Sequence, residues 1–337
     1  MTRTTRRTTL GLLGGAMAAP MLARRARAAT PVTVGALRFT SHAASFVAFE
    51  RGYFAEEGLD VSFKFFQAAQ PMAVAIASRD ADFGVTAITG GLISLARKGA
   101  AKVIGGALSE EKGIDGQKIL ASNAAFDAGL TAPSKLDGAR YAITQSGSSF
   151  HYMGSKIAAA EGVSVTFRPL QKVGAIIGAM KSGQVDAWSI VPHIAAALSN
   201  AGAVKVIGEV ADYIPDYQVT TVFTSADNAA NERDKTAAFI RAFSRGAADY
   251  NAALVDRTAG GDAAEEMVRL IHNYVYVDRP YEKAKPSIVA GAMRINAGAA
   301  LNEASVRDQL SWFHEEGLMD EKVPFGALVD PSYVTLV

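Results

Sequence analysis

Hydrophobic and polar positions follow two alternating periods along the first two-thirds of the chain. Short apolar runs rich in β-branched residues, typical of buried strands, begin at Val32 and Val61. Between them lies a longer segment in which the apolar residues Phe46, Phe49 and Tyr53 recur every three or four positions, as on one face of a helix. This alternation predicts an α/β fold, in which helices cover mostly parallel sheets.

The same pattern places the individual elements. It predicts strands over residues 32–39, 61–66, 81–86 and 102–108, and helices over 43–57, 71–79 and 90–98. A second series follows in the same order, with strands over 139–144, 164–170, 184–191 and 205–210 and helices over 148–161, 173–182 and 192–200. Residues 218–225 read as one more strand, close to a return crossing. Residues 231–320 are helix-rich and amphipathic.

The two series are related by an internal repeat. Residues 58–63 parallel residues 162–167, an offset of 104, and residues 75–82 parallel 179–186 at the same offset. Residues 102–105 parallel 205–208 at an offset of 103. Three matches in one order predict two similar lobes, and two units are too few for a solenoid. We expect residues 29–117 and 226–337 to form lobe 1 and residues 118–225 to form lobe 2.

The first 28 residues read as a targeting segment. They carry six arginines and no acid, and the pair Arg6-Arg7 resembles the twin-arginine signal. An apolar stretch over 10–23 follows, too short to span a bilayer, and Ala28 ends a small-x-small cleavage site. We therefore expect export by the twin-arginine route to the periplasm. An Arg-rich organelle transit peptide or a simple tail is the alternative.

Composition without that segment excludes several classes of protein. Of 34 basic residues, 28 remain against 33 acidic ones, so the net charge is about −5 and there is no basic footprint for nucleic acid. The chain has no cysteine, which excludes disulfides, thiolate metal sites, a cysteine nucleophile and a lipid-modified N-terminal cysteine. We expect a monomer that is free in solution.

A ligand would bind between the two lobes. Ligands of open parallel sheets lie beyond the carboxyl ends of the strands, and two facing lobes bring both sets of loops to one cleft. The candidate residues are those that follow the predicted strands: Ser41, His42, Gln67, Thr86 and Thr89 in lobe 1, and Asn123, Ser146, Gly147, Ser148, Ser149, Trp188 and His193 in lobe 2.

The loop over residues 145–152 is the sharpest of these candidates. Gly147 permits a tight turn, and Ser148 or Ser149 can cap the helix that follows. The first N–H groups of that helix would attract a carboxylate, sulfonate or phosphate. A plain capped helix is the alternative interpretation.

Three other candidates also have two interpretations. Trp188 offers a stacking face for a flat ligand or packs in the core. His42 and His193 contact a ligand or are capping residues, and His151, near a helix N-terminus, should prefer its neutral form.

Enzyme signatures are absent from the sequence. There is no phosphate-binding Gly-x4-Gly-Lys-Ser/Thr motif, no Gly-x-Gly-x-x-Gly after a strand, no Gly-x-Ser-x-Gly elbow and no His-Glu-x-x-His. Histidines and carboxylates show no clear metal-ligand spacing. We therefore predict no catalytic residue, no metal and no cofactor. An exported enzyme on the same fold and a sensory subunit remain alternative hypotheses.

Residues 50–61, ERGYFAEEGLDV, resemble the GYF-x-x-E-GLDV signature of a known family. Its members are the nitrate/sulfonate/taurine (SsuA-like) substrate-binding proteins and the related thiamin-pyrimidine synthases. Residues 75–85, 135–138, 145–149 and 182–187 fit the same family in order, so the resemblance covers about residues 32–250.

The resemblance implies a type II periplasmic-binding-protein fold that delivers a solute to an ABC permease and its ATPase. It places ligand contacts on Ser41, His42, the 86–89 loop, residues 146–149 and Trp188. The synthases carry a cysteine-rich motif that this chain lacks, which argues against such an enzyme. Residues 42–48 match the H-A-G-x-Y-x-A start of the pyrimidine binders only in part. The ligand therefore stays open between a small sulfonate-type anion and a flat heterocycle or aromatic acid.

Overall fold

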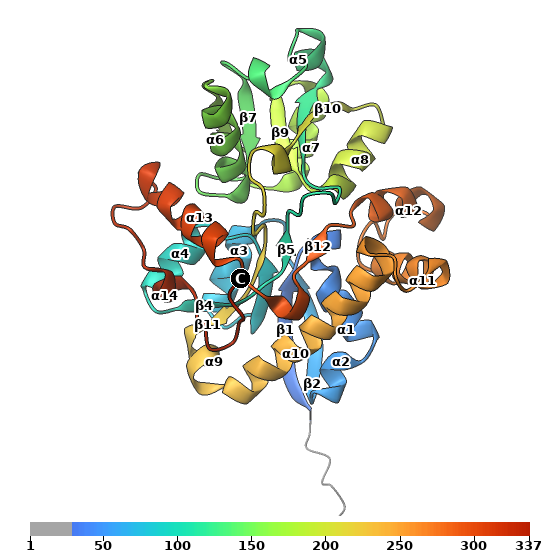
Figure 1. The fold of residues 1–337 in the computed structure, drawn as a ribbon, viewed down its shortest axis with the longest axis vertical. Helices are drawn as coiled ribbons and strands as arrows, with labels where there is room; N and C mark the ends of the chain where they lie inside the picture. Colours follow the sequence, from blue (N-terminus) through green and yellow to red (C-terminus); the bar gives the residue numbers. More distant parts are fainter. Residues whose placement is uncertain (1–28) are drawn as a thin grey trace, which may run out of the picture.

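The computed structural model describes residues 29–337 as two lobes, one above the other in Figure 1. The predicted targeting signal, with Arg6, Arg7 and Ala28, lies outside the described residues. Each lobe is built around a five-stranded sheet with helices packed against it, so the predicted α/β fold with two lobes is confirmed.

The sheet of lobe 1 has the strand order β2-β1-β3-β11-β4. β11 is antiparallel to both of its neighbours, and the other strands run in one direction. The strands are β1 (Thr30–Ala36), β2 (Leu59–Phe65), β3 (Phe83–Thr86), β4 (Ala101–Gly106) and β11 (Thr221–Ser225).

The sheet of lobe 2 repeats this plan with the order β8-β7-β9-β6-β10. Its single reversed strand is β6, which lies where β11 lies in lobe 1. In both sheets the reversed strand is the one that enters directly from the other lobe. The strands are β6 (Lys118–Ser122), β7 (Arg140–Ile143), β8 (Thr166–Pro169), β9 (Ala187–Ile190) and β10 (Val204–Glu209).

The position of β11 corrects one expected boundary. We expected residues up to 225 to belong to lobe 2, but β11 pairs with β3 and β4 in the sheet of lobe 1. Its five residues are all buried, so β11 is a central strand of lobe 1. The second crossing between the lobes therefore ends before Thr221.

Helices of lobe 1 follow the predicted positions with one break. The predicted helix over 43–57 is divided, because Gly52 adopts a left-handed conformation with φ 74° that ends one helix and begins the next. The helices are η1 (Thr40–His42), α1 (Ala43–Glu50), α2 (Tyr53–Glu56), α3 (Ala69–Ala77) and α4 (Gly90–Arg97).

Lobe 2 has its own set of helices. α6 (Ser149–Glu161) and α7 (Val173–Ser182) both end at a left-handed glycine, Gly162 and Gly183. The remaining helices are α5 (Asn123–Asp127), η2 (Pro133–Lys135), α8 (Pro192–Asn200) and η3 (Val210–Asp212), which begins the second crossing.

The C-terminal third returns to lobe 1 and completes its core. On α10 (Arg233–Tyr250), the Phe239 ring stacks on Phe83 of β3 with centroids 4.1 Å apart. The other elements are α9 (Ala226–Asn231), η4 (Asn251–Val255), α11 (Gly261–His272), α12 (Tyr281–Ala290), β12 (Arg294–Ile295), η5 (Ala297–Ala299), α13 (Glu303–Glu315) and α14 (Phe325–Leu328). Figure 1 shows α12 and α13 on opposite sides of the junction between the lobes.

Two chain crossings join the lobes side by side. β5 (Leu108–Ser109) of the first crossing pairs with β12, and the N–H of Val219 in the second crossing donates to the Leu108 carbonyl at 2.9 Å. Among residues 29–337 we find no helix with both the length and the apolar character needed to cross a membrane.

Candidate functional site

A cavity lies between the two sheets, at the strand ends that face each other. It contains about 570 Å³ of space between atoms, including its opening to solvent. Both lobes contribute to its walls, with one aromatic ring from each, Phe39 after β1 and Phe150 at the start of α6. The polar residues that line it are Ser41, His42, Thr86, Gln117, Thr144, Ser148, Ser149 and Thr220.

The walls of this cavity carry no formal charge. No arginine, lysine, aspartate or glutamate is among its described lining residues. Burial lowers the pKa of His42 to about 3, so its imidazole is neutral at physiological pH. Any charge on a ligand therefore has to be stabilised by dipoles and hydrogen bonds.

The N-terminus of α6 lies at the cavity and presents the positive end of a helix dipole. The Ser148 hydroxyl accepts from the His151 N–H at 3.4 Å, and Gly147, at φ 71°, donates its N–H to Nδ1 of His151 at 3.1 Å. His151 is thus an acceptor, and burial lowers its pKa, which agrees with the predicted neutral form. The N–H groups of Ser149 and Phe150 begin the helix, and helix geometry gives them no partner within it.

Lobe 1 contributes Ser41, His42 and Thr86 to the cavity, as the sequence predicted. His42 is only 2% exposed, and its Nδ1 has no hydrogen-bond partner in the protein. A buried polar atom without a partner is costly unless a ligand or water satisfies it. This imidazole is therefore a candidate contact for a bound molecule.

Two predicted residues of lobe 1 lie outside the cavity. The hydroxyl of Thr89 caps α4 by accepting from the Leu92 N–H at 3.1 Å, and it donates to Oε1 of Gln70 at 3.1 Å. Gln67, which follows the edge strand β2, is exposed and is not among the residues that line the cavity. The expectation that Gln67 and Thr89 line the cavity is therefore wrong.

Asn123 is also misplaced by the prediction, and the reason is strand direction. Because β6 runs antiparallel to β9, its carboxyl end lies at the edge of the sheet away from lobe 1. There Nδ2 of Asn123 donates to the Gly202 carbonyl at 2.8 Å. The amino end of β6 faces the cavity instead and brings in Gln117, which the sequence analysis missed. Gln117 could have been placed at the cavity only if the reversed direction of β6 had been known.

Ser146 and Gly147 belong to a separate groove on the outside of the junction. They line it with Gln70, Gly90 and Gln145. The Gly90 N–H donates to the Gly147 carbonyl at 2.9 Å, so this loop joins α4 of lobe 1 to lobe 2. Gly147 is needed for that approach, since a Cβ there would lie 3.0 Å from the Phe313 ring.

Trp188 lies in the core behind the cavity. It is fully buried in the middle of β9, and its ring meets Phe150 edge-on with centroids 5.5 Å apart. Since Phe150 covers it, Trp188 offers no stacking face to a ligand, and that expectation is wrong.

His193 ties the two lobes together instead of lining the cavity. Its Nδ1 lies 2.9 Å from the Tyr276 hydroxyl, which in turn donates to the His193 carbonyl at 3.0 Å. Burial, with smaller contributions from His42 and Arg279, lowers the pKa of His193 to about 3. In the described part of the chain, no group of three or more His, Asp or Glu side chains is placed to hold a metal ion.

Comparisons with known proteins agree with this architecture. Residues 39–253 match the sequence family described as NMT1/THI5 like, and no curated protein matches the chain. The alkanesulfonate-binding protein SsuA of Xanthomonas axonopodis pv. citri, bound to MOPS, is 15% identical with a TM-score of 0.68, covering 91% of this chain and 99% of its own.

Two further solved structures are similar. A Candida albicans gene product with the generic periplasmic binding protein fold is 18% identical with a TM-score of 0.66, covering 86% of this chain and 91% of its own. The periplasmic nitrate-binding protein NrtA of Synechocystis PCC 6803 is 15% identical with a TM-score of 0.61, covering 75% and 68%. At such identities the likeness shows a shared fold, that of the periplasmic binding proteins.

Proposed function

The chain belongs to the NMT1/THI5-like family, and from that premise we propose that it is the solute-binding component of an ABC import system. The observation that carries the proposal is the cavity between the lobes, which is lined by residues from both of them. Two chain crossings join the lobes beside this cavity. Two lobes joined in this way can open and close around a small molecule. The partners would be an ABC permease and its ATPase.

We propose the periplasm as the site of action, with Arg6 and Arg7 directing export by the twin-arginine route. The protein would act as a monomer, with residues 29–117 and 221–337 forming lobe 1 and the chain between them lobe 2. Its role is capture, with no catalytic step, metal or cofactor.

The favoured ligand is a small organic anion with an apolar body. The free N–H groups at the start of α6 suit a sulfonate or carboxylate, and the Phe39 and Phe150 rings suit an apolar or flat remainder. A zwitterion such as taurine would also need an acid for its ammonium group, and none is among the described lining residues. The sulfonate-binding relative by fold supports this choice.

An uncharged flat heterocycle is the second candidate. The neutral imidazole of His42 and the amide of Gln117 favour it, because both can form hydrogen bonds to ring nitrogens or exocyclic groups. This ligand needs no compensation of charge, so the α6 N-terminus would contribute less to its binding.

The test is binding by the purified protein. Native mass spectrometry would identify any molecule that co-purifies, and calorimetry would compare benzenesulfonate, butanesulfonate, taurine, nitrate and an aminopyrimidine. We expect the two organic sulfonates to bind and taurine and nitrate to bind more weakly. If only the aminopyrimidine bound, the second candidate would replace the first. No co-purified molecule and no binding of any probe would overturn the proposal.

A matched pair of variants locates the site. Ser149→Trp fills the cavity at the first residue of α6 and should abolish binding without unfolding lobe 2. Asn123→Trp makes the same change at the first residue of α5, at the opposite edge of the sheet, and should leave binding unchanged. Equal effects of the two changes would place the ligand elsewhere.

A further inference from the structure

Gln117 stands where the first crossing enters lobe 2, at the wall of the cavity. Both of its backbone groups are already used, because its N–H donates to Oε1 of Glu110 at 3.0 Å and its carbonyl accepts from the Val210 N–H at 2.9 Å. The residue is 2% exposed, and its buried Nε2 atom has no hydrogen-bond partner in the protein. The side-chain amide is therefore the part of Gln117 that remains for a ligand.

Glu110 lies next to Gln117 in the same crossing, since its Oε1 accepts from the Gln117 N–H. It is 2% exposed, and its N–H donates to the Tyr217 carbonyl of the other crossing at 2.9 Å. Its Oε2 has no hydrogen-bond partner, and a Cβ at Gly116 would lie only 2.0 Å from that oxygen. Glycine at this position allows the chain to fold back and hold the carboxyl group against Gln117.

Burial and three neighbouring residues decide the pKa of Glu110. Burial raises its pKa to about 7, the Gln117 backbone N–H and the nearby Gln117 amide oppose this, Glu209 raises the pKa further and Lys118 lowers it. Lys118 is shared, since its Nζ lies 2.5 Å from Glu209 and also pairs with Asp115. The Tyr217 hydroxyl is buried without a hydrogen-bond partner, and burial together with the nearby Glu110 raises its pKa. With a pKa of about 7, the carboxyl of Glu110 changes its protonation state near neutral pH.

We propose that Gln117 is a specificity-determining ligand contact and that Glu110 is the positioning residue that decides which end of its amide faces the cavity. An ionised carboxylate only accepts hydrogen bonds, so it attracts the amide NH2 and leaves the amide oxygen for a ligand donor. A protonated carboxyl donates its O–H to the amide oxygen and turns the NH2 group toward a ligand acceptor. This inference rests on the cavity being the ligand site of the proposed function.

The consequence is a ligand preference that changes with pH. Above the titration of Glu110 the site prefers a ligand with a donor, such as an amino group, at this position. Below it the site prefers a ligand with an acceptor, such as a carbonyl. A mismatch leaves a buried polar group unpaired, which corresponds to about a tenfold loss of affinity.

The first experiment needs no ligand. In the full mature protein, the ¹⁵N and ¹H signals of the Gln117 side-chain amide, assigned by their absence in Gln117→Leu, should titrate with a midpoint near pH 7. The titration should vanish in Glu110→Gln. It should persist in Glu111→Gln, which changes the neighbouring glutamate that pairs with Arg294. A signal that does not titrate, or that titrates equally in Glu110→Gln, overturns the inference.

The second experiment measures specificity with two probes. The 3- and 4-aminobenzenesulfonates carry a donor, and the 3- and 4-acetylbenzenesulfonates carry an acceptor. Their affinity ratio should change about tenfold between pH 5.5 and 8.5 in the native protein, and remain constant in Glu110→Gln and Gln117→Leu. A constant ratio in the native protein contradicts the inference. Failure of all four probes to bind contradicts the proposed ligand class instead, and the amide titration then decides about Gln117 alone.

Discussion

The two lobes hold their sheets together in the same way at the edge away from the cavity. In lobe 1 the Asp82 N–H donates to the Thr33 carbonyl, and Oδ2 of Asp82 accepts from the Thr33 N–H, both at 2.8 Å. In lobe 2 Asp186 makes the same two contacts with Arg140, at 2.9 and 2.7 Å. These aspartates occupy matching positions in the repeat, 104 residues apart. We refer to each pair as an aspartate clamp.

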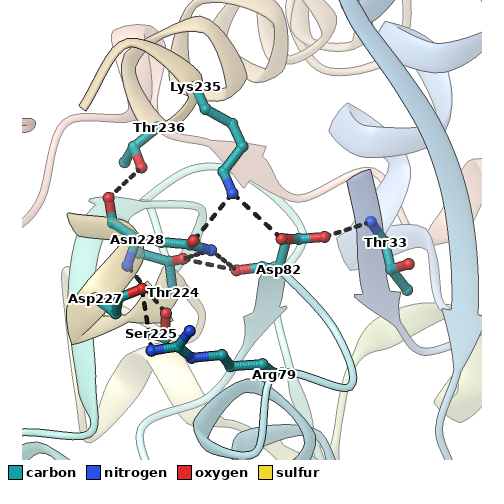
Figure 2. A network of polar contacts seen from close by, with 9 residues as sticks. All are labelled: Thr33, Arg79, Asp82, Thr224, Ser225, Asp227, Asn228, Lys235 and Thr236. Carbon is teal, nitrogen blue, oxygen red and sulfur yellow. Dashed lines mark hydrogen bonds and ion pairs between the residues drawn. The ribbon is translucent and has the colours of Figure 1, made fainter. Parts of the chain in front are cut away.

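The two clamps differ in the partner of the second carboxylate oxygen. Oδ1 of Asp82 faces Lys235 of α10 at 3.5 Å, in a network that includes Thr224 and Asn228 (Figure 2). Oδ1 of Asp186 accepts instead from the guanidinium of Arg140 at 2.6 Å. The clamp of lobe 2 therefore closes within its own strands, whereas that of lobe 1 is completed only when the C-terminal third has returned.

The edges that face the cavity have diverged more. After β1 lobe 1 presents a buried neutral imidazole, His42, while after β7 lobe 2 presents the capped N-terminus of α6 at Ser148. The repeated residues are kept where they hold the sheet and differ where a ligand would bind. The matching aspartates thus hold the two sheets, whereas the residues that line the cavity differ between the lobes.

The largest expected effect comes from removing the clamp carboxylates. Asp186→Ala should lower the free energy of unfolding of lobe 2 by about 3 kcal/mol, because it leaves a strand N–H without a partner and removes the carboxylate from the Arg140 guanidinium, which keeps only its bond to the Gly183 carbonyl. Asp82→Ala should cost about 2 kcal/mol, since its cation is more distant. Urea unfolding would be followed in single-tryptophan variants, with Trp188 reporting on lobe 2 and Trp312 of α13 on the C-terminal segment.

A third aspartate provides the control for this comparison. Asp60 lies exposed on β2, and Asp60→Ala should change the free energy of unfolding by less than about 0.5 kcal/mol. A larger loss from Asp82→Ala than from Asp186→Ala would show that the C-terminal network stabilises lobe 1 more than the local pair stabilises lobe 2.

The plan of the fold could be read from the sequence because it depends on burial periods. Buried strands and amphipathic helices leave patterns that survive in any arrangement, and the repeat adds the relation between the lobes. Ser41, His42, Thr86, Ser148 and Ser149 were predicted to lie at the cavity, and they do so, because each follows or caps an element that points there.

The remaining site residues depend on strand direction and on contacts between distant segments, and the pattern of apolar positions contains neither. The sequence pattern of a strand is the same in both directions, so it does not show that β6 is reversed. Because of that reversal, Gln117 lies at the cavity and Asn123 lies at the far end of the strand. Trp188 lies within β9, where the Phe150 ring covers it, and His193 follows β9 as expected but is held by Tyr276. Such contacts join segments far apart in the sequence.

The next prediction compares the cavity-facing edges by their response to acid. The pKa of His42 is about 3 in the folded protein and about 6.5 in an unfolded chain. The part of the folding stability that depends on neutral His42 is therefore fully present above pH 6.5. It is lost as the pH falls from 6.5 toward 3, because the unfolded chain binds the proton first. At pH 5 the loss is about 2 kcal/mol.

His42→Gln should remove this part of the acid sensitivity, so its loss of stability between pH 7.5 and pH 5 should be smaller by that amount. Ser148→Ala, which removes the cap at the matching loop of lobe 2, should lower stability equally at both pH values. Urea unfolding at the two pH values measures both. An unchanged pH dependence in His42→Gln would mean that this imidazole is not buried in its neutral form.

The smallest effect should come from the cations of the two clamps. Arg140→Ala should cost about 1 kcal/mol, because the guanidinium contacts both oxygens of Asp186 although it is 40% exposed. Lys235→Ala should cost less than about 0.5 kcal/mol, because its ammonium lies 3.5 Å from Asp82. Double-mutant cycles with the aspartates, by urea unfolding, give the two coupling energies. Equal couplings would show that lobe 1 gains as much from its returning helix as lobe 2 gains from its own strand.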